Sequence, residues 1–261
     1  MESAQEDQGG VERLFFELAS ESRLGILRQL LLKPLRTQDI AHSLGLTDTE
    51  AFRQTHRLGE ASLIQKQPDG TYGITQYGKL VLQLSGSLEF AYKYRECLMT
   101  RDIWAMPDEF INRFSELSNA KLNLDVLDSM NKADQVVLSA EKFIWTIGNS
   151  PLDSIGSKIA ERFSHGVSLR LMFHEKLIPM FKDVPEIEGK IEKRALSSTP
   201  GTMLLTEKSA GVSFASIDGR ADYALFFSMD PVFMKWAKDL FEYYWDRGKL
   251  VHPEIKDDVN I

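Results

Sequence analysis

Apolar residues near the amino terminus recur every three or four positions, the spacing of one face of an α-helix. The pattern predicts two amphipathic helices between residues 11 and 33, and a third helix over Thr37–Leu44. Gly45 supplies the left-handed residue that a tight turn between helices often needs. Thr47 is then placed to cap a fourth helix, which runs to about residue 61.

A short hairpin is expected directly after the fourth helix. Two strand-like runs, residues 63–66 and 72–75, flank Pro68-Asp69-Gly70, a strong turn signal. Helix, tight turn, helix and hairpin is the order of a winged helix-turn-helix, which lays one helix in the major groove of DNA with a hairpin beside it. We therefore expect an α+β winged helix-turn-helix DNA-binding domain over residues 11–78.

Helical spacing continues from residue 77 to about 103 and from 107 to about 142. This part predicts a helical linker and dimerisation region over residues 79–142. Dimeric DNA-binding proteins need an element that sets the distance between half-sites, so we interpret the first of these helices as one that also pairs with its copy in a homodimer. A core helix of a single domain is the alternative.

The period changes after residue 142, where strand-like runs begin. Residues 143–147 and 168–173 flank a helical stretch that runs to about 165, a strand–helix–strand unit typical of a parallel pair with a right-handed crossover. We expect an α/β effector-sensing domain over residues 143–250. Its remaining elements are expected at residues 194–196, 202–206, 211–215 and 223–227 as strands and 231–247 as a helix.

Charge and cysteine content narrow the class of protein. The net charge is −7, but residues 11–84 hold nine basic and eight acidic side chains, so the acidity lies elsewhere. A charge this mild suggests modest DNA affinity per protomer and a need for dimerisation. The only cysteine is Cys97, and no apolar run is long enough for a membrane span, so we expect a cytoplasmic protein without metal, cofactor or membrane partner.

The DNA-contacting side chains are expected on the outward face of the fourth helix and in the hairpin. Arg53 is the best candidate for a guanine contact because its fork matches the O6 and N7 acceptors. Phe52 either touches a thymine methyl or packs against a neighbour, and Glu50 either accepts from a cytosine amine or orients Arg53. The full expected set is Thr49, Glu50, Phe52, Arg53, His56, Arg57, Lys66 and Gln67.

A ligand site is expected beyond the carboxyl ends of the first two strands of the α/β domain, where open α/β sheets bind their ligands. A helix beginning at Pro151 would offer free N–H groups there. The expected ligand-binding residues are Trp145, Gly148, Asn149, Ser150, Arg170 and His174. The alternative is that Asn149 or Ser150 only caps the helix and His174 is a surface loop residue.

Several stretches resemble a known family. An ArsR-type winged helix is resembled by Ile40-Ala41 through Leu46, then Arg53, Arg57-Leu58 and Ala61-Ser62-Leu63-Ile64. The second half is similar to the domain found behind such winged helices in archaeal transcription regulators of the methanogenesis-regulatory-protein family, and to the phospholipase D-like effector domain of the trehalose/maltose regulators. The stretches that carry this likeness are residues 143–151, 166–173 and 236–245. The resemblance implies a phospholipase D-like fold and a non-catalytic sensing domain.

Together, these interpretations predict a homodimeric transcription regulator that binds a double-stranded DNA operator and responds to a small-molecule effector. One alternative is a phosphodiesterase-like hydrolase with an accessory DNA-binding head. His174-Glu175-Lys176 matches the start of the phospholipase D motif, but Phe181 stands where that motif has Asp. We therefore expect no catalytic residues and no enzyme activity. A second alternative is an architectural DNA-binding protein without an effector.

Overall fold

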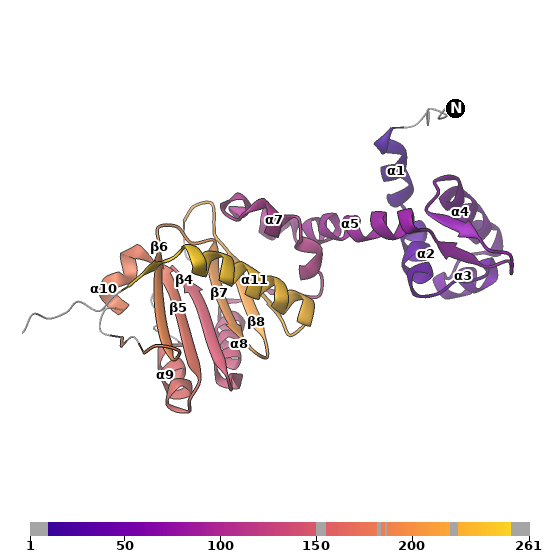
Figure 1. The fold of residues 1–261 in the computed structure, drawn as a ribbon. Helices are drawn as coiled ribbons and strands as arrows, with labels where there is room; N and C mark the ends of the chain where they lie inside the picture. Colours follow the sequence, from indigo (N-terminus) through magenta and orange to yellow (C-terminus); the bar gives the residue numbers. More distant parts are fainter. Residues whose placement is uncertain (1–9, 150–154, 182–183, 186, 220–223, 252–261) are drawn as a thin grey trace, which may run out of the picture. The chain divides into compact units, whose positions relative to one another are not determined.

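The computed structural model describes residues 10–149, 155–181, 184–185, 187–219 and 224–251 (Figure 1). The chain divides into two units, Met1–Gly86 and Ser87–Ile261, and the boundary falls within helix α5 (Gln76–Lys93). None of the helices in these described ranges is both long enough and apolar enough to span a membrane.

The first unit has the order of elements that the sequence indicates. Thr47 caps α4, since its hydroxyl accepts a hydrogen bond from the backbone N–H of Glu50, and Gly45 takes the left-handed conformation with φ of 64°. In the hairpin turn, Gly70 has φ of 83°. The elements are α1 (Val11–Leu18), α2 (Glu21–Leu32), α3 (Thr37–Leu44), α4 (Asp48–Glu60), β1 (Ile64–Lys66) and β2 (Tyr72–Ile74).

One apolar core holds these elements together. The core side chains recur at intervals of three or four residues along each helix, on the face turned toward the other helices. For this reason the hydrophobic periodicity of the sequence predicts them. Leu35 adds a single bridge to Tyr72 at the edge of the hairpin. The fully buried members include Ile26, Leu27, Ile40, Ala51, Leu58 and Leu63.

The strands of the second unit form a mixed sheet. In the described residues it has eight strands in the order β10-β6-β5-β4-β7-β8-β9-β3. The neighbours β6, β5 and β4 run parallel, and every other pair is antiparallel. The strands are β3 (Lys121–Asn123), β4 (Phe143–Gly148), β5 (Ser168–His174), β6 (Ile191–Leu196), β7 (Gly201–Thr206), β8 (Ala210–Phe214), β9 (Leu225–Ser228) and β10 (Lys249–Leu250).

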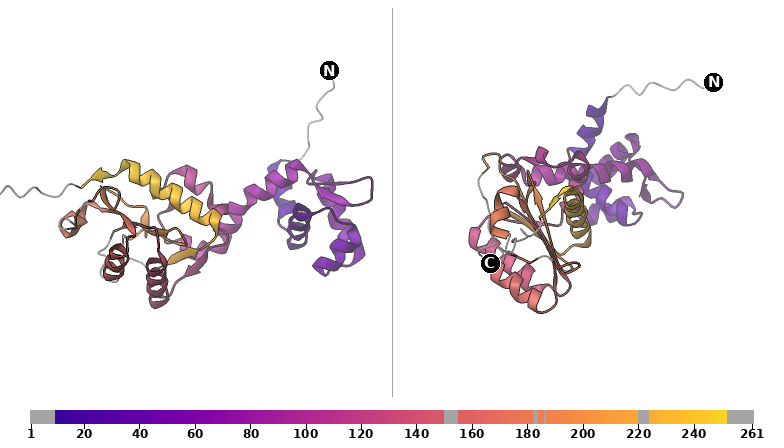
Figure 2. Two further views of the ribbon diagram at one scale, coloured as in Figure 1. Left: turned by 60° about the horizontal axis from the view of Figure 1, so that its bottom comes forward. Right: turned by 60° about the vertical axis from the view of Figure 1, so that its left-hand side comes forward.

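Helices cover both faces of this sheet (Figure 2). On one face lies α11 (Pro231–Arg247), whose Trp236, Leu240 and Phe241 are buried in an aromatic-rich core. On the other face, α8 (Val126–Ser139) and α9 (Gly156–Ser164) pack against the aliphatic side chains of β4 and β5. Side chains alternate between the two cores along each strand, so neighbouring strand positions belong to different faces.

The segment before the sheet differs from the sequence-based expectation. The helix expected to reach residue 103 ends at Lys93, because Tyr94 turns into the core, where its hydroxyl donates to the Ala120 carbonyl at 2.7 Å and its ring meets Phe226. Short helices follow instead of one long helix, and β3 was missed because its pairing with β9 is a tertiary contact without an alternating pattern of its own. These short elements are α6 (Arg95–Leu98), η1 (Ile103–Ala105), α7 (Asp108–Ile111) and η2 (Phe114–Leu117).

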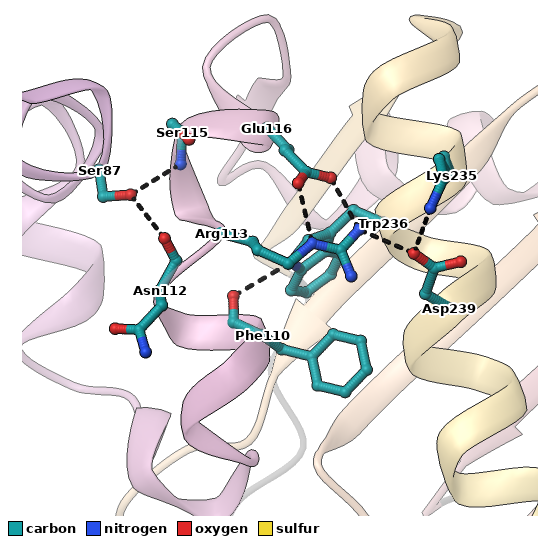
Figure 3. A network of polar contacts seen from close by, with 9 residues as sticks. All are labelled: Ser87, Phe110, Asn112, Arg113, Ser115, Glu116, Lys235, Trp236 and Asp239. Atoms are coloured by element: carbon teal, nitrogen blue, oxygen red, sulfur yellow. Dashed lines mark hydrogen bonds and ion pairs between the residues drawn. The ribbon is translucent and has the colours of Figure 1, made fainter. Parts of the chain in front are cut away.

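Arg113 joins this helical segment to α11 through a network of ion pairs (Figure 3). Its guanidinium donates to both carboxylate oxygens of Glu116 at 2.8 and 2.9 Å, and to Asp239 of α11 at 2.8 Å. The hydrogen bonds to Glu116 raise the pKa of Arg113 above its ordinary value. Burial alone would raise the pKa of Asp239, but hydrogen bonds from Lys235 and Arg113 outweigh it and lower that pKa.

Two further contacts in Figure 3 fix the same segment in place. The indole N–H of Trp236 donates to the Phe110 carbonyl at 3.1 Å. On α5, the Ser87 hydroxyl donates to the Asn112 carbonyl and accepts from the backbone N–H of Ser115. The carboxyl-terminal end of α5 is therefore hydrogen-bonded to the helices that lie over the sheet.

We predict that Arg113→Ala lowers the free energy of unfolding of the second unit by about 1–2 kcal/mol, because two partly buried carboxylates lose charged hydrogen bonds. Urea denaturation followed by tryptophan fluorescence measures this, since Trp104, Trp145, Trp236 and Trp245 are all the tryptophans of the chain. Lys235→Ala is the control, because its side chain is 70% exposed and exposed ion pairs contribute little. Equal losses for both variants would contradict the role given to Arg113.

Candidate functional site

One face of α4 is exposed and carries polar, basic and aromatic side chains together. Thr49, Phe52, Arg53 and His56 lie three or four residues apart, so they share this face, and all four are exposed. The opposite face of the helix is buried in the core of the first unit. The fold thus holds α4 from one side and presents the other to solvent.

Arg53 is an exposed cation on this face. Among the described residues it forms no ion pair, and no hydrogen bond or ion pair joins it to Glu50, which is half-buried one turn before it. The Phe52 side chain is 59% exposed, and its nearest aromatic neighbour is His56, with ring centres 6.3 Å apart. His56 also lies 3.6 Å from the Glu60 carboxylate.

Arg57 is engaged within the protein, which differs from the expectation of a phosphate contact. Its Nη2 and Nε atoms donate to the two carboxylate oxygens of Glu17 at 2.7 and 3.2 Å. This hydrogen bond raises the pKa of Arg57. The guanidinium also lies over the Phe16 ring, 4.9 Å from its centre. Arg57 therefore ties α4 to α1.

Arg23 of α2 forms an ion pair with the same carboxylate. Its Nε atom lies 3.0 Å from a Glu17 oxygen, and both side chains are less than a tenth exposed. Arg23 also donates to the carbonyls of Phe16 and Glu17 and to the Gln54 side chain of α4. Burial lowers the pKa of Arg23. We call Glu17, Arg23 and Arg57 the Glu17 clamp; it connects α1, α2 and α4.

The hairpin presents one of its two expected contact residues. Lys66 is exposed at the end of β1. Gln67 instead folds over the turn, where its side-chain oxygen accepts a hydrogen bond from the Thr71 hydroxyl at 3.2 Å. The backbone N–H and hydroxyl of Thr71 also donate to Asp69 and lower the pKa of that carboxyl group. The turn is thereby held in one conformation beside Lys66.

The expected ligand site in the second unit is divided between two places. Gly148 and His174 end β4 and β5, and His174 accepts a hydrogen bond from the Lys176 backbone, as a loop cap does. Asn149 is exposed beside them, and Ser150 lies outside the described residues. Trp145 lies three residues before Gly148, about 10 Å back along its strand at a rise of about 3.3 Å per residue.

Trp145 and Arg170 line a cleft over the amino-terminal halves of the parallel strands. Trp145 pairs with Arg170, and Arg170 with Glu192, so the three side chains lie side by side on the face that α11 covers. The cleft has a volume of about 270 Å³. Its lining is Lys142, Phe143, Trp145, Ser168, Leu169, Arg170, Gly189 and Glu192. Sequence patterns missed most of these residues because the register of three strands, and no local motif, brings them together.

Aromatic rings and cations alternate beside this cleft. The Arg170 guanidinium lies 4.9 and 5.1 Å from the ring centres of Trp145 and Trp245, and it donates to Glu192 at 2.8 Å. Phe241 of α11 stacks on both indoles. Cation–π contacts of this kind orient a guanidinium without using its hydrogen-bond donors.

No cluster of three or more His, Cys, Asp or Glu side chains within the described part of the chain is arranged to hold a metal ion. No protein-family model matches the sequence, and no curated protein matches it.

Solved structures do align with the chain. TrmBL2, described as an archaeal chromatin protein whose structure shows a novel mode of DNA binding, is 15% identical with a TM-score of 0.44, over 92% of this chain and 97% of TrmBL2. NucT from Helicobacter pylori is 16% identical with a TM-score of 0.39, over 51% of this chain and 99% of NucT. At these scores, no function is transferred from either protein.

A second group of matches corrects the expectation that the chain is not an enzyme. SibL, an S-adenosylmethionine-dependent methyltransferase solved in its apo form, is 14% identical with a TM-score of 0.31, over 73% of this chain and 66% of SibL. Further matching structures are also methyltransferases. The general exclusion of enzyme activity was therefore wrong, although TM-scores of this size do not assign methyl transfer to the chain.

We predict that Glu17→Gln destabilises the first unit by about 2–4 kcal/mol, because Arg23 and Arg57 lose the carboxylate between them and Arg23 is left buried without its ion pair. Hydrogen exchange read by mass spectrometry should then show loss of protection in peptides from α1 and α4. Glu21→Gln, which removes an exposed carboxylate of α2, should leave protection unchanged. Unaltered exchange in Glu17→Gln would show that the clamp does not hold α1 and α4 together.

Proposed function

We propose that the chain is a transcription regulator of ArsR-like winged-helix type that inserts α4 into the major groove of double-stranded DNA. The observation that carries the proposal is the exposed face of α4, which includes Arg53, on a helix whose other face is fixed in the core. A helix held from behind can approach base edges without rearranging the domain, and the β1–β2 hairpin lies next in the chain to contact the backbone.

The contacts divide by chemistry. Arg53 reads guanine through its two terminal nitrogens, and Phe52 offers an apolar contact for a thymine methyl group. Thr49 and His56 flank them on the same face, while Lys66 at the hairpin contacts phosphate and fixes the register. Glu50 lies at the margin of this face, where it can accept from a cytosine amine. Arg57 acts indirectly in this proposal, by holding α4 against Glu17.

Dimerisation through α5 is the second part of the proposal. Tyr77, Leu80, Leu84, Leu88 and Tyr92 follow one another at intervals of three or four residues and are 45–72% exposed. They form an apolar stripe along a helix of 18 residues, which is about 27 Å long at 1.5 Å per residue. An exposed apolar stripe of this length marks an interaction surface.

A second copy of the chain fits this stripe by symmetry. Leu80 and Leu88 lie at equal distances on either side of Leu84, so an antiparallel copy places leucine against leucine at these three positions. Such self-complementarity is what an isologous two-fold interface requires.

The sheet unit is proposed to bind a small-molecule effector, and the phospholipase D-like assignment of its fold is part of the same proposal. An effector changes DNA affinity only if it binds the DNA-competent arrangement of the dimer more or less tightly than the other arrangement. An architectural DNA-binding protein without an effector is the alternative. DNA binding that responds to no small molecule would favour it.

For Arg53→Ala, the proposal predicts that affinity falls about 10- to 100-fold for a duplex selected from random sequences by the unaltered protein, because a bidentate base contact contributes about 1–3 kcal/mol of discrimination. Affinity for unselected duplex should change much less. Fluorescence anisotropy at fixed salt measures both. Arg13→Ala removes an exposed cation of α1 as a control. If the two substitutions lowered affinity for the selected duplex equally, the assignment of Arg53 to a base contact would be wrong.

For the dimer, we expect Leu84→Glu to yield a monomer in sedimentation velocity experiments, because two carboxylates would face each other at the centre of the contact. Leu32→Glu places the same charge on a leucine that is 84% exposed and lies outside the stripe, so this variant should remain dimeric. Dimers of unchanged stability for Leu84→Glu, or a monomeric unaltered protein, would rule out α5 as the interface.

A further inference from the structure

The cleft beside Trp145 contains polar groups that the fold itself does not satisfy. Arg170 uses its Nε atom for Glu192, while among the described residues its two terminal nitrogens have no hydrogen-bond partner. Within the same described ranges the Trp145 indole N–H has none either. The Arg170 and Glu192 side chains are about one third exposed, so a ligand can reach them.

The guanidinium is oriented before any ligand arrives. Trp145 and Trp245 both make cation–π contacts with it, and Glu192 binds its Nε atom, which leaves its two terminal nitrogens for a ligand. Two parallel N–H donors of arginine match the oxygens of a carboxylate or a phosphate. Lys142 lines the same cleft and adds a second, exposed cation.

The remaining lining has a different character. Phe143 is partly buried, and its ring centre lies 4.8 Å from that of Trp145. An aromatic ring in a ligand could pack against these two rings, since aromatic pairs favour offset-stacked or edge-to-face contacts. The cleft volume of about 270 Å³ is close to the lower end of the range for small-molecule sites, about 300–1,000 Å³. A ligand with one aromatic ring or one fused pair of aromatic rings, such as a mononucleotide, fits, while a dinucleotide is too large.

We propose that this cleft binds a small aromatic anion, with its carboxylate or phosphate on Arg170 and Lys142 and its ring against Phe143. Glu192 accepts a hydrogen bond from those ligands that carry a donor, and it excludes ligands with a second anionic group at that position. The proposal rests on the sheet unit acting as the effector-binding part of the regulator, and it places the effector at the amino-terminal halves of β4 and β5 instead of at their carboxyl ends.

Isothermal titration calorimetry on the full-length protein without DNA tests the site. One arm uses phenylacetate, with phenylacetamide for the ring without the charge and acetate for the charge without the ring. The other arm uses AMP, with adenosine and inorganic phosphate as the corresponding controls. We expect phenylacetate or AMP to bind at least tenfold more tightly than both of its controls. The arm that does so identifies carboxylate or phosphate as the anion.

Substitutions locate the binding. Arg170→Gln should lower the affinity for the probe that binds by at least tenfold. Lys142→Gln should lower it by at least threefold. Lys142 is an exposed side chain, so its variant reports on binding even if Arg170→Gln fails to fold. Lys238→Gln is the matched control, because Lys238 lies over the same Trp145 ring at 5.7 Å but does not line the cleft. It should bind the probe as the unaltered protein does.

Three results would overturn the inference: no binding in either arm, uncharged controls that bind as tightly as the anions, or a loss in Lys238→Gln as large as in Lys142→Gln. Because no DNA is present, these results leave the DNA-binding proposal standing. Conversely, a chain that binds the probe but no duplex would refute the proposed regulator while keeping the ligand site.

Discussion

The burial of the Glu17 carboxylate between Arg23 and Arg57 is the interaction on which the DNA-binding unit depends. A carboxylate that is 7% exposed is costly to bury unless cations and hydrogen bonds compensate it. Here the compensation comes from α2 and α4, while Glu17 belongs to α1. Three helices are thereby fixed at one point, and α4 is held by charge as well as by its apolar face. The side chains on its outer face are therefore presented on a rigid support.

In the second unit, strand register holds the side chains of the cleft in fixed positions. Trp145, Arg170 and Glu192 come from three different strands, and their alignment follows from hydrogen bonding between backbones. Packing of α11 against that face then adds Phe241 and Trp245. The result is a guanidinium held by aromatic rings, with donors left for a ligand. Precision here comes from the sheet, since the local sequence around each residue contains no motif.

The sequence predicted well those elements whose signals are local. Thr47 as a cap, Gly45 with its positive φ and the turn at Gly70 all follow from chemistry within a few residues. The ends of α11 were also found, since Pro231 begins a regular run of apolar positions. By contrast, the end of α5 near Tyr94 and the strand β3 depend on partners more than twenty residues away, and no local pattern reports such contacts.

At the candidate sites, too, the sequence predicted the features that local spacing determines and missed those that depend on distant partners. The exposed side chains of α4 were found because helical spacing separates the two faces of a helix. Arg57 was predicted to contact a DNA phosphate because its partner Glu17 lies forty residues earlier. No sequence pattern near Arg57 indicates that partner. Lys142, Phe143 and Glu192 were not foreseen, because the cleft exists only when β4, β5 and β6 pair in register.

Hydroxyl-radical footprinting of the protein, read by mass spectrometry, tests the central claim that α4 binds in the major groove of DNA. Phe52 and His56 are both exposed and both react with the radical, while Trp104, 80% exposed in the second unit, serves as a reference. Our account predicts that saturating duplex DNA lowers oxidation of Phe52 and His56 several-fold and leaves Trp104 unchanged. Full reactivity of Phe52 and His56 in the DNA complex would contradict it.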